Sequence, residues 1–202
     1  GFVMDDSNDN IELVRKSAIY WKYNIKAKAA HITKNNISAL IEESGMSNIG
    51  LLHIDLDGID YWIWDALELG KINPVIVILE YNSLFGITKA ITVPYGDNFN
   101  RTKAHYSNLY WGASLKALYL LSRRKGYAFI GCNSAGNNAY FIRNDKIKNL
   151  KKLTVEEGFA MSKFRESKNK RGDLSFVSGE KRLVLIRRLP VYNSETQQIE
   201  YL

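Results

Sequence analysis

The stretch LLHIDLDGID, residues 51–60, decides the fold. Its apolar first part predicts a strand over residues 51–54, and three carboxylates follow at Asp55, Asp57 and Asp60. Carboxylates this close together repel one another, so they need cations or hydrogen-bond donors nearby. The plainest interpretation is that they lie at the N-terminus of the next helix, where negative charge is favourable.

Apolar runs and helical patterns alternate on both sides of this stretch. Strands are expected at 1–4, 27–32, 51–54 and 74–79, and helices after a cap at Asn8 or Asp9, at 34–43 and at 61–67. Strand–helix alternation predicts an α/β fold with a parallel sheet covered on both faces. Each expected strand ends in polar residues, and ligands bind at this edge of such sheets.

The pattern changes after residue 82. Residues 83–109 form a long irregular stretch rich in Gly, Asn and aromatic residues, which indicates a functional loop. A helix is expected at 113–125, followed by strands at 127–130 and 139–142 on either side of a turn, GCNSAGNN. Glycine and asparagine favour a tight return, so the last two strands are predicted to form an antiparallel pair.

Charge divides the chain into two parts. The net charge is +7, but residues 1–140 hold 14 basic and 13 acidic side chains, whereas residues 141–202 hold 14 basic and 8 acidic ones. We therefore expect an α/β domain over 1–143 and a small basic α+β extension over 144–202 packed on it. In the extension, a capping box at 154–157 predicts a helix, 164–172 is a basic turn-like stretch, and the apolar run at 182–187 predicts a strand.

Composition excludes several classes of protein. The hydrophobic content of 46% and the charged content of 24% are those of a globular chain, and the single cysteine, Cys132, excludes a disulfide framework and a cysteine-based zinc site. No apolar run is long enough to span a membrane, and no basic signal-peptide start is visible. A cytoplasmic location is therefore expected. The nearly neutral first part argues against nucleic acid as a partner.

The motif and the order of the strands together resemble one enzyme family. Asp55, Asp57, Gly58 and Asp60 stand at the four fixed positions of strand-D-[VIL]-[DE]-G-x-[DE], the central motif of FkbM-like methyltransferases. The similarity extends over residues 1–143 and includes the terminal antiparallel pair. It implies a Rossmann-like class I methyltransferase sheet, mostly parallel, and methyl transfer from S-adenosylmethionine to a hydroxyl of a sugar, glycan or other small polar acceptor.

One departure from the family concerns the start of the sheet. Class I methyltransferases open with a strand and a glycine-rich loop, whereas the region up to Asp5 resembles their second strand. The resemblance implies that the missing first strand belongs between the strands ending at Asp5 and at Asp55, where its absence leaves buried backbone groups unpaired. We expect the chain to be a fragment whose cofactor site needs another segment.

The resemblance also implies roles for residues at the strand ends. Asp5 or Asp6 would accept hydrogen bonds from the ribose hydroxyls of the cofactor. His31 and Ile32 would lie beside the adenine. Asp55 would face the sulfonium region, where a carboxylate is electrostatically favourable.

Residues near the other strand ends are candidates for catalysis. Asp57 and Glu80 are expected to handle the acceptor, and together with Asn82 they offer the oxygen ligands that Mg²⁺ prefers. His105 is the candidate general base, because histidine ordinarily titrates near neutrality; loop packing is its alternative role. His53 is expected to be buried scaffold. Acceptor contacts are expected from Tyr81, Asn82, Tyr106 and Asn133, with turn formation an equal explanation for the last.

Two other interpretations remain. The sequence from Asp55 to Gly58 also resembles the nucleophile motif of haloacid-dehalogenase phosphatases, although Ile59 replaces the hydroxyl residue often found there. The other is a non-catalytic or truncated module that binds a nucleotide or glycan and needs another segment for the cofactor site. The basic extension favours an anionic acceptor, and a homodimer stays open.

Overall fold

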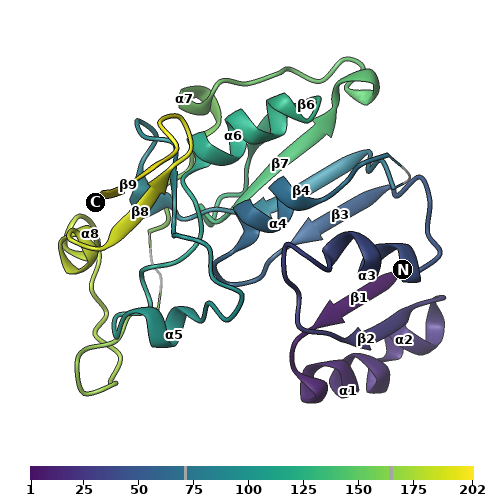
Figure 1. Ribbon diagram of the computed structural model, residues 1–202, viewed down its shortest axis with the longest axis horizontal. Helices are drawn as coiled ribbons and strands as arrows, with labels where there is room; N and C mark the ends of the chain where they lie inside the picture. Colours follow the sequence, from purple (N-terminus) through teal and green to yellow (C-terminus); the bar gives the residue numbers. More distant parts are fainter. Residues whose placement is uncertain (71, 164–165) are drawn as a thin grey trace.

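The computed structural model describes residues 1–70, 72–163 and 166–202 (Figure 1). Its strands lie in three sheets, with orders β1-β2, β3-β4-β7-β6 and β5-β8-β9. The fold is α/β, as predicted from the alternation of strands and helices. Among the described residues, no helix has the length and apolar character that a bilayer crossing requires.

The first sheet is a parallel pair. It consists of β1 (Phe2–Asp5) and β2 (Lys26–Ala29), connected through α1 (Asn8–Lys16) and α2 (Ala18–Lys22). The cap of α1 is Ser7, whose hydroxyl accepts from the amide of Asn10, so the predicted cap at Asn8 or Asp9 is wrong. These elements form a group beside the central sheet (Figure 1).

The central sheet is mixed. Its strands are β3 (Leu51–Ile54), β4 (Ile76–Glu80), β7 (Asn138–Arg143) and β6 (Tyr127–Cys132). β3 and β4 are parallel, whereas β7 pairs antiparallel with both β4 and β6. The predicted antiparallel pair at the end is confirmed: β7 runs opposite to β4 and β6, whereas β3, β4 and β6 share one direction, as expected for a mostly parallel sheet.

Helices α3 (Ile37–Glu43), α4 (Asp60–Ala66) and α6 (Leu115–Arg124) pack with this sheet. Ile63 and Trp64 on α4, like Leu118 on α6 and Val77 on β4, have no exposed surface. This is the main core of the molecule. It fixes the end of β3 and the start of α4, between which the loop with the three carboxylates lies.

The third sheet joins the long loop to the end of the chain. The loop contains η1 (Ser83–Phe85), β5 (Ile91–Thr92) and α5 (Arg101–Ala104); β5 pairs with β8 (Pro190–Asn193), which pairs with β9 (Gln198–Tyr201). A second core forms here from Leu84, Phe85, Ile91, Val93, Leu109, Tyr110, Ile186 and Val191. The stretch 83–109 is thus ordered by strands that lie more than 80 residues later in the chain.

The remaining elements belong to the extension. The capping box is confirmed: the Thr154 hydroxyl accepts from the Glu157 amide, and the Glu157 carboxylate accepts from the Thr154 amide, at the start of α7 (Val155–Gly158), which follows η2 (Asn144–Lys146). Residues 182–187 were predicted as a strand, but α8 (Lys181–Ile186) is a helix. Of the basic stretch 164–172, residues 164 and 165 lie outside the described residues, and the remainder forms a turn held by a bridge between Lys168 and Leu174.

Candidate functional site

The loop between β3 and α4 is pinned by the third carboxylate of the motif. Asp60, the first residue of α4, is fully buried; its Oδ1 accepts from the Leu56 amide at 2.9 Å and its Oδ2 from the Gly58 amide at 3.1 Å. A Cβ on Gly58 would lie 2.2 Å from the ring of Phe99, so this position requires glycine. The loop therefore has a fixed course, which leaves the side chains of Asp55 and Asp57 exposed.

Burial and neighbouring charge act strongly on Asp60. Desolvation, followed by the charges of Glu80 and Asp55, raises the pKa of its carboxyl from 3.8 to about 8. Hydrogen bonds from the backbone amides of Leu56 and of Asp60 itself lower this pKa, but burial dominates. Asp60 thus fixes the loop through two hydrogen bonds, and its raised pKa reflects both its burial and the neighbouring carboxylates.

Three carboxylates from two strands meet at this edge of the sheet. One oxygen each of Asp55, Asp57 and Glu80 lies within 4.8 Å of the others. Glu80 ends β4 and is 3% exposed; its Oε1 is 3.5 Å from the side-chain nitrogen of Asn137 in the β6–β7 turn. We call these three residues the acid cluster. A hard divalent cation is one partner that such oxygens can take.

The acid cluster already has one cationic neighbour. Arg101 Nη1 donates to Asp57 Oδ1 at 2.5 Å, and its guanidinium lies 5.7 Å from the ring centre of Trp111. The Arg101 side chain is 20% exposed and that of Asp57 67%. No sequence motif identifies Arg101 as a neighbour of the acid cluster, because its contact with Asp57 forms only when α5 folds back onto the loop after β3.

Asn82, expected as a metal or acceptor ligand, is directed to the protein backbone. Its side-chain nitrogen donates to the carbonyl oxygens of Leu109 and Trp111, each at 2.9 Å, and its Oδ1 accepts from the Leu84 amide. It is 2% exposed. Asn82 therefore ties the start of the long loop to the segment before α6, and it is Asp55 that completes the acid cluster with Asp57 and Glu80.

The candidate cofactor residues gather at the ends of β1 and β2. Asp6 Oδ2 lies 3.5 Å from His31 Nδ1, and His31 Nε2 lies 2.8 Å from the carbonyl oxygen of Asp97. Asp5 instead accepts from the amide of Ser7 and the side chain of Asn10, so it stabilises the start of α1. With 77% of its side chain exposed, Asp6 is the acid that a ligand can reach.

The other expected acceptor and catalytic residues have hydrogen-bond or packing partners within the protein. His105 Nδ1 lies 2.7 Å from the Ser107 hydroxyl, its ring packs on Tyr106, and burial lowers the pKa of its imidazole. It follows α5, which Arg101 begins. Tyr81 is fully buried and donates to the Ala160 carbonyl at 2.5 Å.

Asn133 organises the turn between β6 and β7. Its Oδ1 accepts from the amides of Gly136, Asn137 and Asn138 at 3.1 Å, and its side-chain nitrogen donates to Asn137 Oδ1 at 2.8 Å. Because Asn137 in turn faces Glu80, Asn133 reaches the acid cluster through one intervening side chain.

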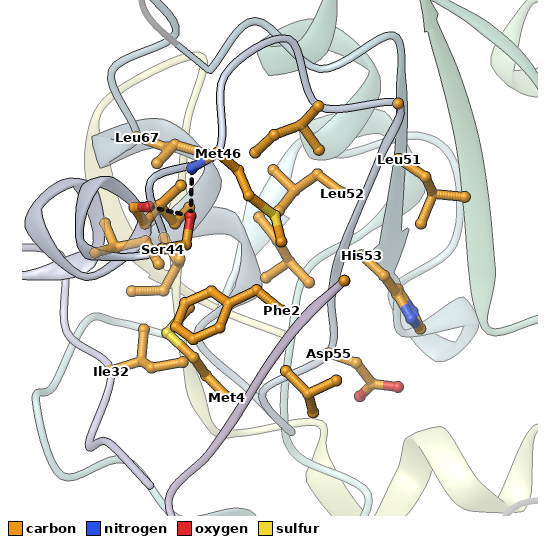
Figure 2. Close-up of a pocket in the computed structure, with 18 of the residues that line it drawn as sticks. Phe2, Met4, Ile32, Ser44, Met46, Leu51, Leu52, His53, Asp55 and Leu67 are labelled. Carbon is orange, nitrogen blue, oxygen red and sulfur yellow. Dashed lines mark hydrogen bonds between the residues drawn. The ribbon is translucent and has the colours of Figure 1, made fainter. Parts of the chain in front are cut away.

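A cavity of about 890 Å³ lies between β1 and β3 (Figure 2). Its walls include Phe2 and Met4 from β1, and His53 and Asp55 at β3, so the acid cluster borders it through Asp55. His53 is exposed and lines the cavity, so the expectation of a buried scaffold residue is wrong. Ile32 also contributes to the lining.

Comparisons of the chain with models of known protein families, with curated proteins and with solved structures gave no match.

Proposed function

We propose that the chain is an S-adenosylmethionine-dependent O-methyltransferase of the FkbM-like type, acting on a hydroxyl of a sugar, glycan or other small polar acceptor. The observation that carries the proposal is the position of Asp55. It borders the cavity between β1 and β3 and belongs to the acid cluster with Asp57 and Glu80. A cofactor on one side of Asp55 and an acceptor on the other would meet at this residue.

The residues present fit part of the cofactor. Asp6 offers an exposed carboxylate to the ribose hydroxyls, Ile32 offers an apolar surface to the adenine beside His31, and Asp55 offers negative charge to the sulfonium. When bound, the cofactor supplies an electrophilic methyl group. We expect the chain alone to bind the cofactor weakly, because Asp6, Ile32 and Asp55 contact only its adenosine and sulfonium parts.

The chain's own residues would position the acceptor and accept its proton. Holding the attacking oxygen in line with the methyl group supplies most of the acceleration in such a transfer. Glu80 and Asp57 are the groups that would orient the hydroxyl. His105, which burial favours in the neutral form, remains the predicted general base. Mg²⁺ at the acid cluster remains a prediction too, and it would compete with Arg101 for Asp57.

A second candidate function is a module that binds a nucleotide or glycan without catalysis. The observation that favours it is the open space between β1 and β3, which separates the candidate cofactor residues at β1 and β2 from the acid cluster. Such a module would keep ligand binding at Asp6 and Asp55. It would transfer no methyl group to any acceptor.

Calorimetric titration with S-adenosylmethionine, with and without Mg²⁺, tests the proposal. We expect saturable binding that Asp55→Asn weakens at least about tenfold, because the contribution of a carboxylate beside the positively charged sulfonium is of this size. Asp9→Asn, an exposed acid on α1, is the matched control and should bind as the unaltered chain does. Equal affinity of the Asp55 variant and the unaltered chain would contradict the proposed cofactor site.

A further inference from the structure

The short helix α2 leaves large apolar and aromatic side chains exposed. Ile19 and Trp21 on this helix are 60% and 78% exposed, and Tyr23, which caps its end, is 57% exposed. We call these three residues the α2 patch. Tyr20 between them is half-buried, and its ring lies edge-on to that of Trp21 with 5.6 Å between the ring centres. Clustered exposed side chains of this kind indicate an interaction surface.

The chain around the α2 patch carries only positive charge. Residues 13–28 contain no acidic side chain and five basic ones, which are Arg15, Lys16, Lys22, Lys26 and Lys28. Arg15 and Lys28 form ion pairs with glutamates outside this segment. Lys16 and Lys22 have no carboxylate partner among the described residues. Their charges are therefore available to an anionic partner.

These two lysines lie next to the α2 patch. Lys16 is the last residue of α1, and Ser17 both ends α1 and caps α2, so Lys16 lies at the junction of the two helices. The Lys22 ammonium lies 5.5 Å from the centre of the Tyr23 ring. Apolar, aromatic and cationic groups thus share one small surface.

The α2 patch lies at the opposite end of the strands from the candidate site. α2 leads into the amino end of β2, and Asn24 in this connection accepts a hydrogen bond from the Gly1 nitrogen, just before β1. The acid cluster lies at the carboxyl ends of its strands. In Figure 1, α1 and α2 lie on the outer side of the β1-β2 pair, away from the central sheet. A partner at the α2 patch would therefore leave the candidate site open.

An anionic lipid surface has the chemistry that matches this patch. Tryptophan and tyrosine are favoured at the boundary between lipid headgroups and acyl chains, where the ring is buried and its polar atom stays hydrated. Lysine places its ammonium group among the phosphates while its methylene chain lies along apolar surface. Each lysine near an anionic leaflet adds an attraction that salt screens over about 10 Å.

Nucleic acid and a second copy of the chain match it less well. Single-stranded nucleic acids stack their bases on aromatic rings along a basic groove. Ile19 offers no ring, and the α2 patch projects from the outer edge of the molecule instead of lining the cavity. A two-fold contact between two copies of the patch would bring the unpaired lysines of both copies together, where they repel each other.

We propose that the α2 patch is a peripheral docking site for an anionic lipid bilayer. Ile19, Trp21 and Tyr23 enter the headgroup region, and Lys16 and Lys22 contact lipid phosphates. Apolar burial and electrostatic attraction together set the strength of such a contact. The inference rests on exposure and charge, and it does not depend on methyl transfer.

Co-sedimentation of the full chain with lipid vesicles tests this docking. We expect binding to phosphatidylcholine vesicles that contain about one third phosphatidylserine, and at least about tenfold weaker binding to phosphatidylcholine alone. Tryptophan emission should shift to shorter wavelength on binding, because Trp21 leaves water, whereas the other tryptophans are already buried or half-buried. Trp21→Phe should remove this shift, and Trp21→Ser should weaken binding.

Two double variants separate docking at the α2 patch from general attraction to a basic protein. Lys16→Gln with Lys22→Gln should weaken binding at least about tenfold. Lys148→Gln with Lys170→Gln removes the same charge from exposed positions of the extension. It should change binding less than about twofold, because charges farther from the lipid than the screening length contribute little.

Four results would overturn the proposal. The first is no binding to the anionic vesicles, and the second is equal loss of binding in the two double variants, which would show that net charge alone attracts the chain. The third is tryptophan emission that vesicles leave unchanged. The fourth is a dimer that Trp21→Ser converts to a monomer, which would assign the α2 patch to a second copy of the chain.

Discussion

Asp57 and Arg101 form an ion pair, 2.5 Å between Oδ1 and Nη1, that ties the loop after β3 to α5. The two residues are 44 positions apart, and the contact brings the long loop over the acid cluster. Because Asp57 is 67% exposed, the pair contributes at most about 1 kcal/mol to stability. Its main effect is to occupy one carboxylate of the cluster.

Replacement of Arg101 should therefore change the affinity of the cluster for cations more than the stability of the fold. In Arg101→Met, Asp57 is left without its cationic neighbour, and binding of Mn²⁺ or Mg²⁺ should tighten several-fold. Lys103→Met, an exposed residue on the same helix, is the control. Trp111 fluorescence or calorimetry gives the affinity. Identical cation affinity of the two variants would contradict competition between Arg101 and a cation for Asp57, and no saturable binding to either variant would show that the acid cluster is no cation site.

Gly58→Ala tests the close packing of the motif loop. A Cβ there meets the Phe99 ring at 2.2 Å, so the variant should lose about 1–3 kcal/mol of unfolding free energy. Gly96→Ala, at a glycine with open space around it, should change stability by less than about 0.5 kcal/mol. Chemical denaturation of both variants measures the difference. Equal stability would mean that the loop and Phe99 do not pack as described.

The buried carboxyl of Asp60 predicts a pH dependence of stability. Its pKa is about 8 in the folded chain and 3.8 when exposed, so the folded state binds one more proton between these values. The contribution of Asp60 to the free energy of unfolding is therefore fully present below pH 3.8. It falls by up to about 1.4 kcal/mol per pH unit as the pH rises, and it is lost above pH 8. Asp60→Asn should remove that slope. Denaturation midpoints from pH 5 to 8 test it, and parallel slopes in the two proteins would contradict the assignment.

The contacts of Arg182 predict how firmly the extension is held against η1 of the long loop. This residue is 1% exposed, and its guanidinium donates to the carbonyl and hydroxyl oxygens of Ser162, which contacts Ser83. Arg182→Met leaves buried acceptors unpaired and should cost about 1–3 kcal/mol. The exposed Arg187, changed to Met, should have little effect. Thermal unfolding of both variants measures the difference. Equal melting temperatures would contradict a stabilising role for the contacts of Arg182 with Ser162.

The same residue explains one failure of prediction from sequence. The run Arg182–Arg187 has four consecutive apolar residues between two arginines, a pattern that a buried strand and a short helix share. The helix forms because Arg182 and Ile186, four residues apart, are both buried, while Val184 between them is 61% exposed. The partners that bury Arg182 come from residue 162, which local sequence does not reveal.

Other elements were predictable because local chemistry determines them. The strand before Asp55, the hairpin around Asn133 and the capping box at Thr154 follow from apolar pattern, turn residues and a side-chain cap. Among the site residues, the proximity of Asp57 and Glu80 was predictable, because each follows or ends one of two neighbouring strands. The strand pattern could not predict the contact of Arg101 with Asp57 or the hydrogen bonds of Asn82 to the backbone, because both depend on how the long loop folds back.

Mapping of S-adenosylhomocysteine by ¹⁵N–¹H chemical shifts tests the central claim most directly, because it locates a weakly bound ligand residue by residue. The account predicts saturable shifts at Asp6, Ile32 and Asp55, with little change at the amides of α8. Saturable shifts confined to the extension, or no shifts at millimolar ligand, would contradict a cofactor site at this edge of the sheet.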